Sequence, residues 1–176
     1  KPTSEVKIIG ECAEEDHGTT VIFHPDATIF QTTVYQFSIL SNRLRDLAYL
    51  NAGVTLSLTD LRDKDEHGVP RTEIYHSETG LDDFVRYLDE GKEPLISDVI
   101  HITNNEGEIP VEVAMTYNKT FKENIYSFVN NINTIEGGTH LQGFRMGLGT
   151  SLKKYAEKSK ALEKAKVELS KEDFLQ

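Results

Sequence analysis

The chain has 176 residues, of which 38% are hydrophobic and 27% are charged, and its net charge is -10 at neutral pH. This length fits one ordinary domain or two small ones, with enough apolar residues to build a core. A domain that held nucleic acid over its whole surface would be basic, so the acidic balance confines any such contact to a local basic stripe. The single cysteine, Cys12, excludes an internal disulfide framework and a cysteine-based zinc site.

The sequence also indicates the cellular compartment in which the protein is expected. No apolar run approaches the roughly 20 residues that a membrane span needs, and no signal-peptide pattern occurs at the start. The single cysteine fits a reducing environment. The chain begins at Lys1 and not at Met, and it enters strand-like sequence at once. We therefore expect a cytoplasmic protein, and we expect this chain to be a piece of a longer one.

The first part of the chain predicts strands around one helix. Apolar residues recur at helical spacing from Phe37 to Leu50. Gly53 follows as a helix stop, because glycine tolerates the left-handed conformation at a C-terminal cap. Alternation of apolar and polar residues marks the strands, and an acidic turn at 14–18 separates the first two. In chain order the predicted elements are strands at 5–9 and 18–23, a helix at 37–50, and strands at 54–59 and 71–76.

The second part begins with a change in composition near residue 78. The run Ile125–Val129 is apolar on both faces and predicts a central strand. A long amphipathic helix is expected to follow it, and the charged tail 160–176 ends without a strand to pair. In chain order the predicted elements are a helix at 81–88, strands at 99–103, 111–117 and 125–129, and a helix at 139–159.

Residues that could carry chemistry are few. The six histidines show no metal-ligand spacing, and His140 at a helix start is expected to make a loop or cap contact. Gly137–Gly138 precedes that helix, a position that can bind anions through free backbone N–H groups but is more often a tight turn. Basic residues on and beyond the long helix are either a solvated face or a salt-dependent phosphate-binding stripe. They are Arg145, Lys153, Lys154, Lys158, Lys160, Lys164 and Lys166. From these residues alone the sequence indicates a soluble α+β protein without an assigned function.

Ordered sequence segments give a more specific indication. They are Gly18–Asp26, Leu44–Asn51, Val111–Met115, Glu123–Thr134, and Glu136–His140 with Gly143–Arg145. Together they resemble the B subunit of bacterial DNA gyrase along essentially the whole chain, with the B subunit of topoisomerase IV as the alternative. The sequence Asn133–Glu136 and the long helix are more similar to gyrase.

The resemblance implies a layout and an activity. Residues 1–77 resemble the C-terminal part of a GHKL-type ATPase domain, an α/β sandwich. Residues 78–176 resemble the first part of a transducer domain with a left-handed βαβ crossover, which is an exception to the usual right-handed rule. The full protein would use ATP and Mg²⁺ to drive DNA strand passage and negative supercoiling. It would act with the gyrase A subunit, with DNA and, through the ATPase domain, with a second B subunit.

The resemblance also implies site residues. Thr19 matches a threonine near the adenine of ATP, and Val21 matches a valine in the adenine-pocket wall, which is also the aminocoumarin site. Arg145 matches an arginine that faces a DNA-sized cavity; its plainer interpretation is an ion pair with a helix neighbour. The long helix departs from the family at Gly147 and Gly149, which replace better helix formers, and at Thr150, where relatives often carry a second Arg.

The family's catalytic parts fall outside the matched segments. Its general-base Glu, magnesium-binding Asn, adenine-contacting Asp and ATP lid precede Lys1, and its Gln-Thr-Lys loop follows Gln176. Phosphoryl transfer needs a positioned water, Mg²⁺ and charge neutralisation together. We therefore expect no catalytic residue, no metal ligand and no ATPase activity in this chain alone. The alternatives are a stand-alone, non-catalytic binding or dimerisation module, and dimerisation through an exposed apolar edge.

Overall fold

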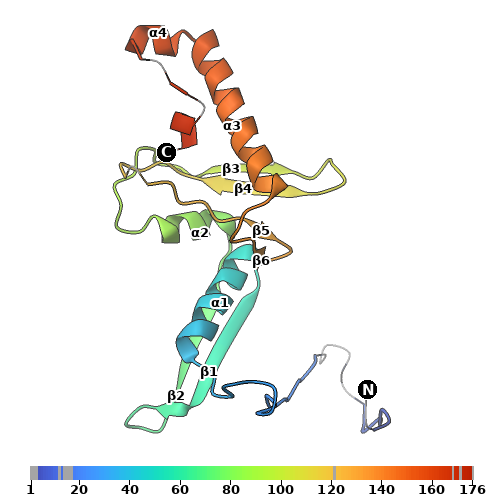
Figure 1. Ribbon diagram of the computed structural model, residues 1–176. Helices are drawn as coiled ribbons and strands as arrows, with labels where there is room; N and C mark the ends of the chain where they lie inside the picture. Colours follow the sequence, from blue (N-terminus) through green and yellow to red (C-terminus); the bar gives the residue numbers. More distant parts are fainter. Residues whose placement is uncertain are drawn as a thin grey trace. The chain divides into compact units, whose positions relative to one another are not determined.

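The computed structural model describes residues 4–11, 13, 18–120, 122–167, 169–170 and 172–175. Cys12 and most of the acidic turn expected at 14–18 lie outside this set. The chain divides into two compact units, Lys1–Gln36 and Phe37–Gln176 (Figure 1). Within the described part of the chain, no helix is long and apolar enough to cross a membrane.

The first unit does not form the two strands expected at 5–9 and 18–23, so both of these predictions are wrong for this chain. The described residues of both segments have no strand hydrogen bonding. Their apolar side chains face solvent, and Val6 is 98% exposed. A strand needs a hydrogen-bonded neighbour, and an alternating pattern supplies only its face preference. The local order in this unit is a turn in which Thr28 N–H and Oγ1 donate to Asp26 Oδ1 at 2.8 and 2.7 Å.

The second unit begins with a helix packed on a β-hairpin. Helix α1 (Phe37–Leu50) contacts both β1 (Thr55–Lys64) and β2 (Pro70–His76), which pair antiparallel. The register runs regularly from Thr55 opposite His76 to Asp60 opposite Arg71 and shifts beyond that point. Gly53 ends the helix with a φ of 82°, and its N–H donates to the Ser77 carbonyl at 2.8 Å. The sequence prediction for this helix, its glycine stop and both strands is confirmed.

The aromatic core of this unit lies between α1 and α2 (Leu81–Leu88). Phe84 is 5% exposed and stacks on Tyr49 with ring centroids 5.2 Å apart. Tyr126 and Phe128 lie against the same ring at 6.0 and 6.1 Å. Gly80, just before α2, has a φ of 63°, and a Cβ there would lie 3.3 Å from the Tyr49 carbonyl oxygen. The two helices therefore approach closely because this position has no side chain.

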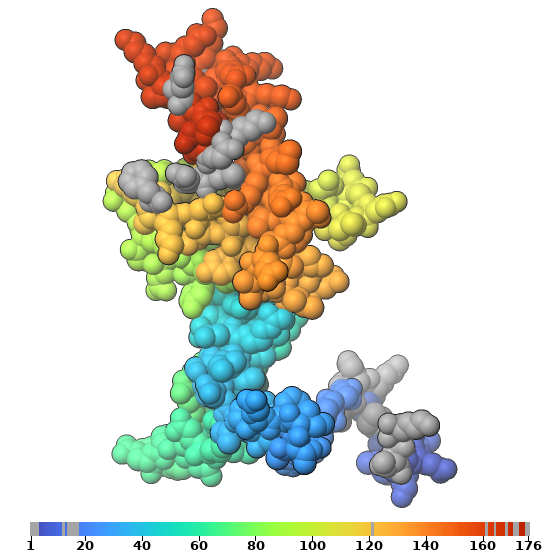
Figure 2. Space-filling model, in the orientation of Figure 1, coloured from blue at the N-terminus to red at the C-terminus, as the bar shows by residue number. Residues whose placement is uncertain are grey.

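Two further hairpins complete the sheets. Strands β3 (Ile100–Asn104) and β4 (Val111–Met115) pair antiparallel, and the end of this hairpin projects from the unit's surface (Figure 2). Strands β5 (Phe128–Val129) and β6 (Ile132–Asn133) form a short hairpin. The central strand expected at Ile125–Val129 is therefore wrong in length and place. Asn130 and Asn131, with φ of 49° and 64°, reverse the chain after two residues of pairing.

The α+β class is confirmed, because helices accompany three separate two-stranded antiparallel sheets. In the part of the chain that the structure describes, no strands pair in parallel, so these residues do not form the left-handed βαβ crossover. The long helix is confirmed as α3 (Thr139–Lys158), and it contacts α4 (Ala161–Ala165) and the 3₁₀ turn η1 (Glu172–Leu175). The domain boundary near residue 78 stays a prediction.

Candidate functional site

Thr19 and Val21, the residues expected at an adenine pocket, lie on an extended segment of the first unit. Both are exposed, and the Val21 side chain is 75% accessible to solvent. Phe23 on the same segment makes an edge-to-face contact with Tyr35, with centroids 6.3 Å apart. The segment is therefore extended and exposed at both of these positions.

Arg145, the residue expected to face DNA, lies in the second turn of α3 and is ion-paired with Glu123. The Arg145 side chain is 40% exposed and that of Glu123 is 30% exposed. Arg145 Nε is buried and has no hydrogen-bond partner among the residues described. The ion pair that the sequence left open is thus present, with a partner 22 positions upstream and not on the helix.

An open depression lies beside this ion pair. It has a volume of about 460 Å³ and is lined by Glu123 and Ile125, by the loop 135–138, and by Leu141, Gln142 and Arg145 of α3. One guanidinium and two carboxylates, those of Glu123 and Glu136, border it. Because the guanidinium already binds one of these carboxylates, the depression has no surplus of positive charge for an anion.

The glycine pair before α3 is a structural turn. Gly137 has a φ of 77°, and its N–H donates to the Thr134 carbonyl at 2.8 Å. At Gly138, with a φ of 155°, a Cβ would lie 2.8 Å from the His140 ring. His140 Nε2 in turn lies 3.2 Å from Thr134 Oγ1. The expected loop contact of His140 is confirmed, and both glycines have a positive φ that side chains rarely adopt.

The basic residues of α3 beyond Arg145 are Lys153, Lys154 and Lys158. Lys154 and Lys158 are exposed. No ion pair involves any of these three lysines in the portion of the chain that is described. This arrangement is typical of a solvated helix face, and the phosphate-binding alternative stays a prediction.

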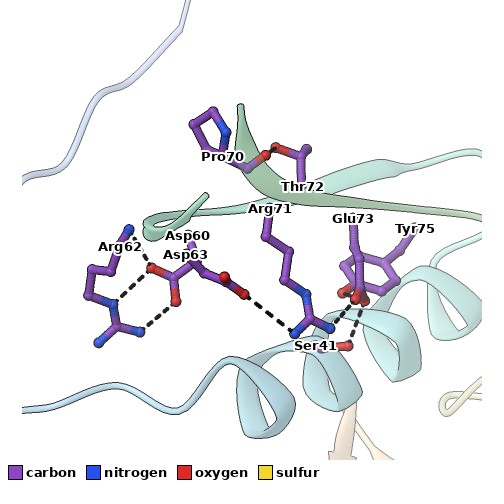
Figure 3. A network of polar contacts seen from close by, with 9 residues as sticks. All are labelled: Ser41, Asp60, Arg62, Asp63, Pro70, Arg71, Thr72, Glu73 and Tyr75. Carbon is purple, nitrogen blue, oxygen red and sulfur yellow. Dashed lines mark hydrogen bonds and ion pairs between the residues drawn. The ribbon is translucent and has the colours of Figure 1, made fainter. Parts of the chain in front are cut away.

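A polar network missed by the sequence analysis joins α1 to the β1–β2 hairpin (Figure 3). The Glu73 carboxylate accepts from Arg71 Nη2 at 2.7 Å, from the Tyr75 hydroxyl at 2.7 Å and from buried Ser41 Oγ at 3.0 Å. These donors, that of Arg71 first, lower the pKa of Glu73 from 4.5 to about 2. The Arg71 guanidinium also lies 3.9 Å from the centre of the Phe37 ring. Every group here is paired within the network, so its role is to hold the helix on the hairpin.

No group of three or more His, Cys, Asp or Glu side chains that could hold a metal ion occurs within the described ranges. The one guanidinium at the depression is engaged by Glu123. The guanidinium at the depression is therefore not free to bind a phosphate, and the adenine-pocket roles of Thr19 and Val21 stay predictions.

Solved structures resemble this fold. The 43K ATPase domain of Thermus thermophilus gyrase B in complex with an aminocoumarin superposes with a TM-score of 0.64 at 31% identity, over 78% of this chain and 36% of that one. The B-subunit of the DNA gyrase from Myxococcus xanthus gives a TM-score of 0.67 at 26% identity, over 76% of this chain and 36% of that one. The mixed helices and small sheets therefore belong to the class of gyrase B ATPase domain structures, of the GHKL fold.

Sequence relatives narrow this class to a family. The model of the DNA gyrase B family matches residues 80–176. The DNA gyrase B subunit of Eisenibacter elegans is 51% identical over 173 residues, and that of Cytophaga hutchinsonii is 50% identical; both alignments cover 98% of this chain. The chain belongs to the DNA gyrase B family. It spans 36% of the length of these two relatives, about a third.

Proposed function

We propose that this chain is part of the B subunit of a bacterial DNA gyrase, an ATP-hydrolysing type II topoisomerase. The whole subunit would couple ATP binding and hydrolysis to strand passage and negative supercoiling in the cytoplasm. Its partners would be the gyrase A subunit, DNA and, through the ATPase domain, a second B subunit. The observation that carries this proposal is 51% identity to a gyrase B subunit over 98% of the chain.

In this proposal residues 1–77 supply part of the ATPase domain. Thr19 and Val21 form part of the adenine-pocket wall, which is consistent with their exposure on one extended segment. The Thermus thermophilus domain was solved in complex with an aminocoumarin, and we infer that the same wall takes this inhibitor class. ATP and Mg²⁺ would be held mainly by residues outside this chain. The 176-residue chain alone is therefore expected to hydrolyse no ATP.

Residues 78–176 supply part of the transducer, with α3 as its main helix. We infer that Arg145 faces DNA in the whole subunit. Arg145 is ion-paired with Glu123. A DNA phosphate would therefore have to compete with the Glu123 carboxylate for the guanidinium. The partial exposure of the Arg145 side chain leaves one side of it accessible for such an exchange.

A chimeric protein tests the proposal. This chain would replace the 173 aligned residues of the Cytophaga hutchinsonii B subunit, and the chimera would be combined with that organism's A subunit. We expect ATP-dependent negative supercoiling of relaxed plasmid. The matched control is the same chimera without ATP, which is expected to leave the plasmid relaxed. A chimera that folds and binds an ATP analogue but supercoils no DNA would contradict the proposal.

A further inference from the structure

Asn131, in the turn between β5 and β6, is hydrogen-bonded at two places to α1 and its end. Its carbonyl oxygen accepts from Arg43 Nη2 at 2.8 Å, and its side-chain amide donates to Asn51 Oδ1 at 3.0 Å. Arg43 lies within α1, and Asn51 directly follows the last residue of that helix. Asn51 in turn donates from Nδ2 to the Leu47 carbonyl at 2.7 Å and so satisfies one of the free carbonyls at the helix end. One residue of the turn is therefore bonded both to the body of α1 and to the residue that closes it.

The side chain of Asn131 is not required by the turn itself. The two-residue loop has φ of 49° at Asn130 and 64° at Asn131, as a type I′ turn requires. Asn-Gly is a preferred pair for such a turn, because glycine adopts a positive φ without a steric penalty. Asn130 is exposed and has no side-chain hydrogen bond within the described part of the chain, whereas Asn131 is half-buried and bonded to Asn51. Two identical residues in similar backbone conformations thus differ in what their side chains contact.

The same hairpin is tied to the start of α3. Thr134, just after β6, donates its N–H to the Ser127 carbonyl at 2.8 Å and so extends the pairing. The Thr134 carbonyl accepts from Gly137 N–H at 2.8 Å, and Thr134 Oγ1 lies 3.2 Å from His140 Nε2 in the first turn of α3. A continuous series of hydrogen-bonded groups therefore leads from α1 through Asn131 and the hairpin to the beginning of α3.

We propose that Asn131 is a positioning residue that fixes the start of α3 relative to α1. Its amide is the specific element, since the carbonyl that binds Arg43 belongs to the backbone and is present whatever the side chain. The consequence rests on the proposed function, in which α1 belongs to the ATPase part and α3 to the transducer part. Because coupling between sites is carried by contiguous packed and hydrogen-bonded groups, a displacement of α1 would be transmitted through Asn131 to the helix that carries Arg145.

Double-mutant cycles in urea unfolding of the 176-residue chain measure the amide contact. Asn131→Gly keeps the turn and the backbone carbonyl but removes the amide, and it is combined with Asn51→Ala. We expect a coupling of about fivefold in the unfolding equilibrium constant, which is the net value of one hydrogen bond. The matched control is Asn130→Gly with Asn51→Ala, which makes the same replacement in the same turn and should show no coupling.

Two further measurements separate positioning from a local contribution to stability. In the Asn51→Asp background, which keeps the accepting oxygen, Asn131→Gly should destabilise the chain as much as it does in wild type. The amide resonances of Thr139 and His140, at the start of α3, should shift in Asn131→Gly and stay in place in Asn130→Gly. Equal couplings in the two cycles, or equal shifts in the two variants, would overturn the proposal.

The chimeric protein tests the same residue in the whole enzyme. Supercoiling per ATP hydrolysed should fall about fivefold in Asn131→Gly at unchanged basal ATP turnover, and it should be unaffected in Asn130→Gly. Equal supercoiling per ATP in these two variants would also overturn the proposal. A chimera with neither substitution that supercoils no DNA would contradict the proposed function instead, and the unfolding cycles and α3 resonances would then decide the role of Asn131.

Discussion

The ring of Phe84 offers the most direct test of the packing between α1 and α2. Phe84 is 5% exposed and contacts Tyr49, Tyr126 and Phe128. Replacing it with alanine removes most of a buried aromatic surface and leaves a cavity, which costs roughly 3–5 kcal/mol. The lost stacking on Tyr49 adds about 0.5–1.5 kcal/mol beyond area burial. We therefore expect the upper part of that range for Phe84→Ala.

Urea unfolding followed by circular dichroism measures this cost as a shift of midpoint at constant slope. Phe84→Leu keeps most of the volume and loses the ring contacts, so it should cost roughly half as much as the alanine variant. Tyr155→Ala is the matched control, because that ring is 71% exposed on α3 and its loss should change stability by about 0.5 kcal/mol or less. If Phe84→Ala and Tyr155→Ala lose similar amounts, the aromatic core is not where the stability resides.

Three other predictions concern backbone, pH and the ion pair on α3. Gly80→Ala should destabilise the chain by more than Gly53→Ala in the same urea assay. Both glycines have a positive φ, which costs an alanine about 1 kcal/mol, but of these two only position 80 has neighbours within 4 Å. Equal losses of stability would mean that the helices adjust freely to the added methyl group. The Glu73 carboxyl has a folded pKa of about 2, against 4.5 for the free group. It therefore adds stability that is present above pH 4.5 and lost as the pH falls toward 2. The stability difference between wild type and Glu73→Gln should shrink across that window, and a constant stability difference would show that the network is absent. In the chimeric protein, Arg145→Gln should lower DNA-stimulated ATP turnover more than basal turnover. Glu123→Gln should leave the DNA stimulation at or above that of wild type. An equal loss of basal and stimulated turnover in Arg145→Gln would count against contact with DNA.

The sequence predicted those elements whose signals are local. The helix Phe37–Leu50 and its glycine stop follow from spacing and from the conformational freedom of Gly53, and the structure has both. Such signals act within a few residues, so the structure that they predict does not depend on distant parts of the chain.

Features that depend on a distant partner could not be read in this way. The runs 5–9 and 18–23 have strand-like alternation, but pairing requires a neighbour that the pattern does not specify. The partner of Arg145 was missed because Glu123 is 22 positions away, and no periodicity links a loop carboxylate to a helix. The short β5 is set by Asn130 and Asn131, whose positive φ was not anticipated from an Asn-Asn pair.

The turn between β5 and β6 has a consequence for how this chain acquires its structure. The Asn131 carbonyl accepts from Arg43 Nη2 at 2.8 Å, and its side chain donates to Asn51 Oδ1 at 3.0 Å, across 88 and 80 positions. Contacts this distant raise the contact order and slow folding, because a long loop must close before they form. On the ribosome, α1 would emerge well before the turn whose Asn131 contacts Arg43 and Asn51. The early helix and hairpin therefore complete their tertiary contacts only after synthesis has passed residue 131.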